Sequence, residues 1–181
     1  MRFLAFIVIF LAANTGYSQL KDTSFHLYSA YVADTFIIKI AAFTGITEKG
    51  NYYSIYTLDG DETFAGATLA LKSIKGLNKN ILLISVCYGA AYGQKGNKRD
   101  RDYSPTLPEG SHGSKFLNFL SKELIPYISV HYPVREEKTL TGYSAGANFT
   151  LYTLLTRPLL FTNYLAGSIG SSLDSSFLFR S

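Results

Sequence analysis

Only one cysteine, three histidines and no tryptophan occur among the 181 residues, and these shortages exclude several kinds of site. A single cysteine, Cys87, cannot form an intramolecular disulfide, so stability must come from side-chain packing. Cys87 ends an apolar run, which favours a small buried residue over a thiol nucleophile. Clusters of cysteine, histidine and carboxylate residues at metal-ligand spacing are absent, and we expect neither a metal nor a cofactor.

An excess of charge of one sign is lacking as well. The formal net charge is +4, and it falls to +3 when Arg2 is left out. Basic residues gather in residues 95–101, but acidic residues lie among them, and no stripe of basic and aromatic residues of the nucleic-acid-binding kind is present. We therefore expect no nucleic-acid partner, and we interpret residues 95–101 as a solvated loop that can also meet an anionic substrate.

Long apolar runs are scarce, and the clearest one lies at the N-terminus. Arg2 precedes the apolar residues 3–13, and small residues occupy the −3 and −1 positions of a cut before Gln19. This pattern predicts a signal peptide over residues 1–18. Eleven apolar residues are too few to span a bilayer as a stable helix. We expect a secreted or periplasmic domain over residues 19–181 with no stable membrane span, an uncleaved anchor being the alternative.

The hydrophobic pattern gives an order of elements that defines a fold class. It predicts strands at 25–31, 36–43, 52–58, 81–86, 138–141 and 164–168, and helices at 63–77, 114–130 and 147–156. Asp61 stands where the N-cap of the first helix belongs, and Pro126 should kink or end the second. The long stretch 88–112 is irregular, as functional loops often are. Two antiparallel strands followed by alternating strands and helices predict an α/β fold, with a mostly parallel sheet and helices on both faces.

Residues 142–146 read Gly-Tyr-Ser-Ala-Gly and form the most informative motif of the chain. A predicted strand precedes the motif and a predicted helix follows it, which is the context of a nucleophile elbow. In such a turn the hydroxyl of Ser144 is exposed, and the helix N-terminus favours a negatively charged oxygen. This arrangement suits acyl transfer, of which ester hydrolysis is the commonest form. The alternative is a glycine-rich turn that only joins a strand to a helix.

Four segments occur in the order found in one known family, and together they are more specific than the elbow alone. They are residues 53–60 (YSIYTLDG), 99–106 (RDRDYSPT), 116–128 (with FLSKELIPYI) and the elbow at 142–146. Over about residues 24–172 the chain resembles the Putative esterase family of α/β-hydrolases, which includes siderophore esterases, esterase D-like enzymes and acyltransferases of the antigen 85 kind. The resemblance implies an α/β-hydrolase fold.

The resemblance also implies roles for individual residues. Ser144 would be the nucleophile that forms an acyl-enzyme. The backbone N–H groups of Ala145 and Asp61 would form the oxyanion hole. The carboxylate of Asp61 would repel a nearby oxyanion, unless that side chain points away as the cap of its helix.

Three further side chains are candidates for binding the substrate. Arg99 and Arg101 could orient an acidic substrate, and Tyr143 adjoins the nucleophile. The alternative for both arginines is pairing with Asp100 and Asp102, which would fix the loop. The expected partner is a small-molecule ester, and the basic loop favours an anionic one such as a siderophore.

The catalytic acid and base that the family places after its serine are missing. No histidine follows Ser144, and Asp174 is the sole acid there. Without a general base the hydroxyl stays a weak nucleophile. His26, His112 and His131 all precede the elbow. His112 adjoins the irregular stretch 88–112 and is a candidate base, with Asp174 as a candidate acid, because a triad depends on geometry and not on sequence order.

We therefore interpret residues 19–181 as an esterase domain that is incomplete at its C-terminus and inactive as it stands. The alternatives are a non-catalytic remnant or ligand-binding protein, and an acyltransferase on the same scaffold.

Overall fold

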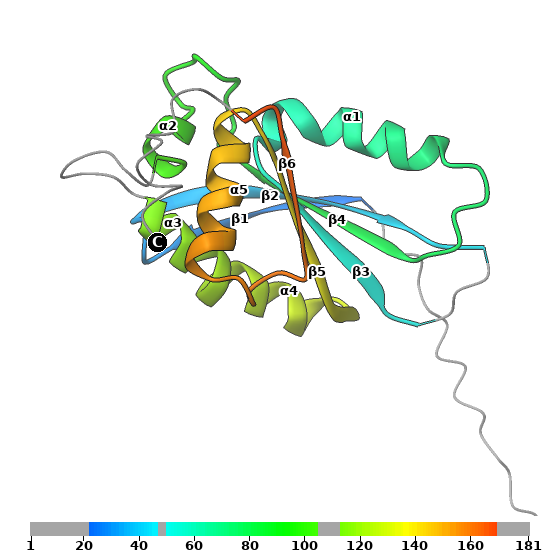
Figure 1. The fold of residues 1–181 in the computed structure, drawn as a ribbon. Coiled ribbons are helices and arrows are strands. Elements are labelled where there is room, and N and C mark those ends of the chain that lie inside the picture. Colours follow the sequence, from blue (N-terminus) through cyan, green and yellow to red (C-terminus); the bar gives the residue numbers. More distant parts are fainter. Residues whose placement is uncertain (1–21, 47–49, 105–112, 170–181) are drawn as a thin grey trace, which may run out of the picture.

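The computed structural model describes residues 22–46, 50–104 and 113–169. A six-stranded sheet in the order β1-β2-β4-β3-β5-β6 forms the centre of this part of the chain (Figure 1). Its strands are β1 (Thr23–Ser29), β2 (Asp34–Phe43), β3 (Tyr52–Thr57), β4 (Ile81–Cys87), β5 (Val134–Tyr143) and β6 (Asn163–Gly167). β2 runs antiparallel to β1 and to β4, whereas β4, β3, β5 and β6 are parallel to one another. The predicted α/β fold with an antiparallel N-terminal pair is confirmed.

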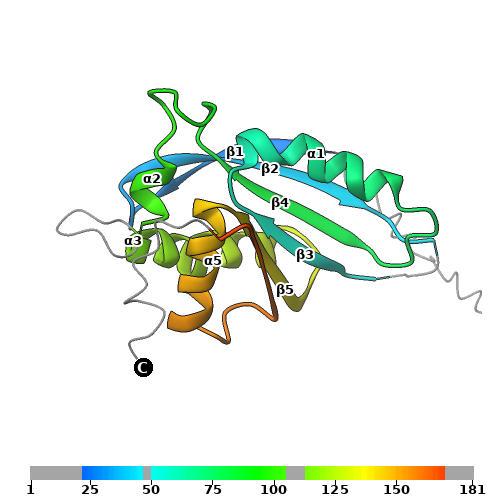
Figure 2. The same cartoon turned by 45° about the horizontal axis from the view of Figure 1, so that its top comes forward.

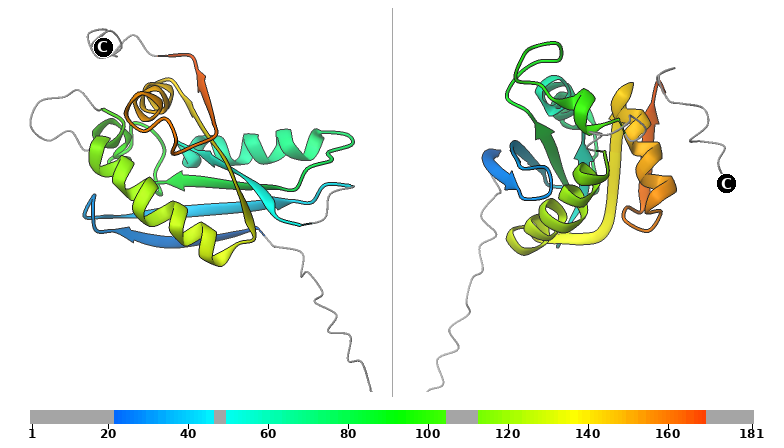
Figure 3. Two further views of the ribbon diagram at one scale, coloured as in Figure 1. Left: turned by 60° about the horizontal axis from the view of Figure 1, so that its bottom comes forward. Right: turned by 90° about the vertical axis from the view of Figure 1, so that its left-hand side faces the viewer.

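Helices cover both faces of the sheet, as expected. On one face α1 (Gly60–Ser73) packs along β4 and β2 over Ala41, Phe43 and Leu83 (Figure 2). On the other face lie α3 (Gly113–Asn118), the π-helical segment η1 (Phe119–Leu124), α4 (Ile125–His131) and α5 (Ala145–Thr156), while α2 (Arg99–Asp102) is a short turn near the end of β4 (Figure 3).

The larger core lies on the face of α3, α4 and α5 and is rich in aromatic rings. Phe36 of β2 stacks on Phe119 with ring centroids 4.4 Å apart. Phe116 of α3 meets Phe149 of α5 at 5.1 Å. Because these rings are fully buried, they fix α5 relative to the sheet and to α3. β4 is buried over nearly its whole length, as is usual for a strand of a sheet that is covered on both faces.

One local prediction is wrong, because the N-cap of α1 is Asp59 and Asp61 lies inside the first turn of the helix. Pro126 was predicted to kink or end its helix, and of these alternatives the second is excluded, because the helix continues to His131. There the N–H of Ile125 bonds to the carbonyl of Leu120, five residues back, and this wider turn is the local break that admits a proline in the next position.

Cys87 is a buried free cysteine, and burial raises the pKa of its thiol to about 12. It therefore stays protonated near neutral pH, in line with its interpretation as a small core residue. Within the described ranges, no helix combines the length and apolar character needed to cross a bilayer. The same ranges contain no group of three or more histidine, cysteine or acidic residues that could hold a metal ion. The predicted signal peptide, His112 and Asp174 lie outside the described residues.

Candidate active site

The turn between β5 and α5 has the geometry of a nucleophile elbow. β5 ends at Tyr143 and α5 begins at Ala145, with Ser144 between them at φ 55° and ψ −117°. A non-glycine residue in such a conformation costs about 1–3 kcal/mol and persists only where surrounding contacts hold it. The Ser144 N–H donates to the carbonyl of Gly167 at 3.0 Å, and its own carbonyl accepts from the N–H of Asn148 at 3.1 Å.

The side chain of Ser144 is not used to cap its helix. It makes no capping hydrogen bond to α5, and the residue is partly exposed. Serine at an N-cap usually accepts a hydrogen bond from one of the first helical amides. The hydroxyl therefore remains at the carboxyl edge of the sheet, where a ligand can reach it.

Both glycines of the motif allow a close approach that a side chain would prevent. A Cβ atom on Gly142 would lie 2.2 Å from the carbonyl oxygen of Gly146 and 2.8 Å from Thr150 Oγ1. A Cβ atom on Gly146 would lie 3.1 Å from Asp59 Oδ2. The first contact is far inside van der Waals distance, so α5 can follow β5 this tightly only with glycine at position 142.

A second helix begins beside the elbow. β3 is the parallel neighbour of β5. Leu58 directly follows β3, and its backbone N–H donates to the carbonyl of Thr141 at 3.1 Å. Asp61 lies in the first turn of α1, and Ala145 is the first residue of α5. Backbone N–H groups in a first helical turn have no acceptor within the helix, and they lie at its positive end. The two amides predicted as oxyanion donors thus belong to helix ends on adjacent strands, and their role stays a prediction.

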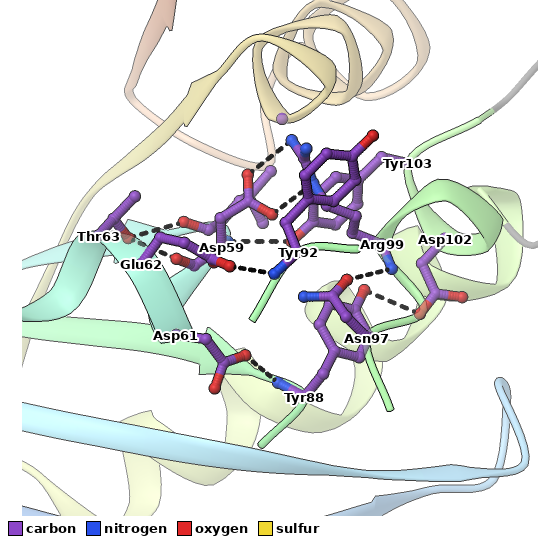
Figure 4. Close-up of polar contacts among 12 residues, drawn as sticks. Asp59, Asp61, Glu62, Thr63, Tyr88, Tyr92, Asn97, Arg99, Asp102 and Tyr103 are labelled. Carbon is purple, nitrogen blue, oxygen red and sulfur yellow. Dashed lines mark hydrogen bonds and ion pairs between the residues drawn. The ribbon is translucent and has the colours of Figure 1, made fainter. Parts of the chain in front are cut away.

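The carboxylate of Asp61 is bound away from the start of its own helix. It accepts hydrogen bonds from the backbone N–H groups of Tyr88 at 2.6 Å and Gly89 at 3.1 Å, just after β4 (Figure 4). Two such bonds neutralise part of its charge and fix its direction. The expected conflict between this carboxylate and an oxyanion is therefore reduced, although by a different contact from the helix cap.

The two candidate arginines both have carboxylate partners within the protein. Arg99 pairs with Asp59, and neither Asp100 nor Asp102 is its partner. Arg101 pairs with Asp102 through Nε at 2.7 Å, as the alternative interpretation predicted, and with Asp34 through Nη1 at 2.9 Å.

Substrate binding by these arginines stays a prediction, but it would require each guanidinium to exchange a protein partner for a ligand. Tyr143, by contrast, is 63% exposed beside the nucleophile.

A hollow of about 380 Å³ adjoins the elbow on the face of the sheet that carries α1. Its walls come from α1 and from the carboxyl ends of β3, β5 and β6, and they include Thr63, Ala67, Gly142, Tyr143, Leu165 and Gly167. The contribution of α1 and β6 to this hollow could not be predicted from the sequence, because that contribution depends on the order of the strands in the sheet.

Neither described histidine lies near the elbow. His26 is on β1, separated from β5 by three strands, which is about 19 Å at the usual strand spacing. His131 ends α4 and stacks on Tyr127 with ring centroids 4.0 Å apart. His131 precedes β5, whereas Ser144 follows that strand. Because ten residues of strand span about 33 Å, the two residues lie beyond opposite ends of β5.

The sequence model of the family described as "Putative esterase" matches residues 38–176. The chain belongs to this family. The chain is 30% identical over 149 residues to ferri-bacillibactin esterase BesA of Bacillus subtilis, a match that covers 71% of this chain and 51% of that protein. A second Bacillus subtilis relative, the uncharacterized protein YjcH, is 29% identical over 120 residues, 65% of this chain and 48% of the relative. The chain thus spans about half the length of the curated relatives it matches.

Solved structures show the same fold. An IroE-like serine hydrolase from Shewanella oneidensis superposes with a TM-score of 0.66 at 27% identity, covering 81% of this chain and 50% of that one. The BES protein from Bacillus cereus superposes with a TM-score of 0.68 at 22% identity, covering 92% and 65%. The fold is therefore the α/β-hydrolase-like esterase fold of these structures.

Proposed function

We propose that this chain carries the nucleophile of a carboxylic ester hydrolase, and that Ser144 forms the acyl-enzyme. The observation that carries the proposal is the conformation of Ser144. Its backbone is strained, its hydroxyl is not used as a helix cap, and glycines at 142 and 146 allow the tight turn. Strain of this kind is retained where it serves a function, and the family membership favours ester hydrolysis.

The reaction would proceed in two steps. Ser144 Oγ attacks the carbonyl carbon of the ester, its proton passes to a base, and the carbonyl oxygen becomes an oxyanion. The backbone N–H groups of Ala145 and Asp61 would donate to that oxygen. The bond to the alcohol oxygen then breaks, the alcohol leaves with a proton, and water hydrolyses the acyl-serine to release the acid.

A base must accept the serine proton, and the positions of His26 and His131 do not suit that role. His112 as base and Asp174 as acid stay predictions. Without such a base, acylation of Ser144 would be slow, because an unassisted serine hydroxyl is a weak nucleophile.

The name of the BesA relative indicates a substrate class. BesA is a ferri-bacillibactin esterase, and we propose that the ester cleaved with Ser144 is likewise of the siderophore type. We further propose that residues 1–18 direct export, which would place the domain where such esters are met.

A fluorophosphonate probe tests the proposal. We expect it to label the chain and to spare Ser144→Ala, with added imidazole increasing the labelling rate by acting as the base. Equal labelling of both proteins would refute the assignment of Ser144. Binding of a ferric siderophore with no labelling would instead favour the non-catalytic alternative.

A further inference from the structure

A buried ion pair joins the turn after β3 to the short helix α2. Arg99 Nη2 donates to Asp59 Oδ2 at 2.9 Å, and Arg99 Nε lies 2.8 Å from Asp59 Oδ1 without the direction of a hydrogen bond. The two side chains are only 10% and 9% exposed. Charges held this far from water are costly unless they are paired, so the position of each group constrains the other.

Asp59 is held in a backbone conformation that non-glycine residues rarely adopt. Its backbone is left-handed at φ 54° and ψ 43°. Aspartate at an N-cap usually accepts a hydrogen bond from its own helix, but this carboxylate makes no capping bond and turns to Arg99 instead (Figure 4). The N–H of Asp59 donates to Tyr103 Oη at 3.1 Å. Contacts from α2 and Tyr103 therefore set both the backbone and the side chain of this residue.

The same pair also touches the elbow. A Cβ atom added to Gly146 would lie only 3.1 Å from Asp59 Oδ2. The carboxylate of Asp59 therefore packs directly on the first turn of α5. The guanidinium of Arg99 lies over the rings of Tyr92 at 4.7 Å and Tyr103 at 5.6 Å, which limits its movement. Arg99 thus connects α2, the start of α1 and the start of α5.

We propose that Arg99 is a positioning residue, which acts through Asp59 to hold the turn of residues 59–61 so that the N–H of Asp61 faces the ester oxygen. This inference rests on the proposed function of Ser144. Binding of the substrate by Arg99 would instead require its guanidinium to leave Asp59, which would strand a buried carboxylate. A misplacement of about 1 Å at a reacting centre can cost about 100-fold in rate.

The test uses three variants of the full chain. Arg99→Lys keeps the charge but loses the planar fork. The double variant Asp59→Asn/Arg99→Gln removes both charges together, so that neither is left buried alone. The matched control is Arg157→Lys, since Arg157 at the other end of α5 likewise joins two segments by donating to Ser121 and Asn118.

Two readouts are needed. The first is the amide ¹H–¹⁵N spectrum, in which the signals of Gly60 and Asp61 report the turn. The second is phosphonylation of Ser144 by an uncharged fluorophosphonate, from which the maximal rate and the half-saturating concentration are measured separately. We expect the turn signals to shift in both Arg99 variants and the maximal rate to fall about 100-fold, with the half-saturating concentration unchanged. Arg157→Lys should change neither readout.

Each contrary result has a distinct meaning. Unshifted turn amides would overturn the positioning role, whatever the labelling shows. Shifted amides with an unchanged maximal rate would also overturn it, and a change in the half-saturating concentration alone would assign Arg99 to ligand binding. A wild-type chain that is not labelled at Ser144 would refute the proposed function, whereas the amide signals would still decide whether Arg99 holds the turn.

Discussion

Replacing Gly142 by alanine tests the elbow geometry most severely. The added methyl would lie 2.2 Å from the carbonyl oxygen of Gly146, about 1 Å inside an ordinary contact, and 2.8 Å from Thr150 Oγ1. Thr150 Oγ1 donates to that same carbonyl in a buried hydrogen bond of 2.8 Å. Overpacking of this kind costs about 1–3 kcal/mol, and loss of the hydrogen bond adds about 1 kcal/mol. We therefore expect Gly142→Ala to lower the free energy of unfolding by about 3 kcal/mol.

Urea unfolding followed by circular dichroism measures this change, and Gly66 provides the matched control. Gly66 lies in the exposed interior of α1, and a Cβ atom there would meet nothing within 4 Å. Gly66→Ala should stabilise the chain by about 1 kcal/mol through helix propensity. If Gly142→Ala cost less than about 1 kcal/mol with an unchanged dependence on urea, the close packing of β5 against α5 would be refuted.

Three other substitutions test single features of the site. Ser144→Gly should be about 1 kcal/mol more stable than Ser144→Ala, because glycine relieves the positive φ, and equal urea midpoints would contradict the strain. Burial raises the pKa of Asp59 to about 6, so the folded state binds this proton more tightly than the unfolded state does. The free energy of unfolding should therefore fall by up to about 3 kcal/mol as the pH rises from about 4 to about 6. Asp59→Asn should lose that part of the pH dependence in parallel urea titrations, and an unchanged slope would argue against it. Tyr103→Phe leaves the buried N–H of Asp59 without an acceptor and should cost about 1–2 kcal/mol, whereas an unaltered midpoint would show that the bond contributes little.

The elbow could be predicted from the sequence because its signals are local. Glycines at 142 and 146, a strand before them and a helix after them all lie within one short segment, and the structure confirms the strand, the turn and the helix. The fold class was also accessible, since an antiparallel pair followed by alternating strands and helices restricts the topologies that a sheet can adopt, but the order of the strands in the sheet was not predicted.

The network around Asp59 could not be predicted in the same way. Arg99 is forty residues away along the chain, and its charged neighbours in sequence were the more obvious partners. The misplaced N-cap has a related cause, because Asp59 and Asp61 are both of a residue type common at N-caps, and only the structure shows that the helix begins at Gly60. The helix that contains Pro126 was predicted over residues 114–130, but its π-helical turn was not, since such a turn leaves no mark in the hydrophobic pattern.

The central claim is that the hydroxyl of Ser144 accepts an acyl group. Incubation with p-nitrophenyl acetate, followed by intact mass and peptide mapping, tests it most directly. We expect one acetyl group per chain, located on the peptide that contains Ser144 and missing from Ser144→Ala. Acetyl groups spread over lysines, at equal levels in both proteins, would contradict the account.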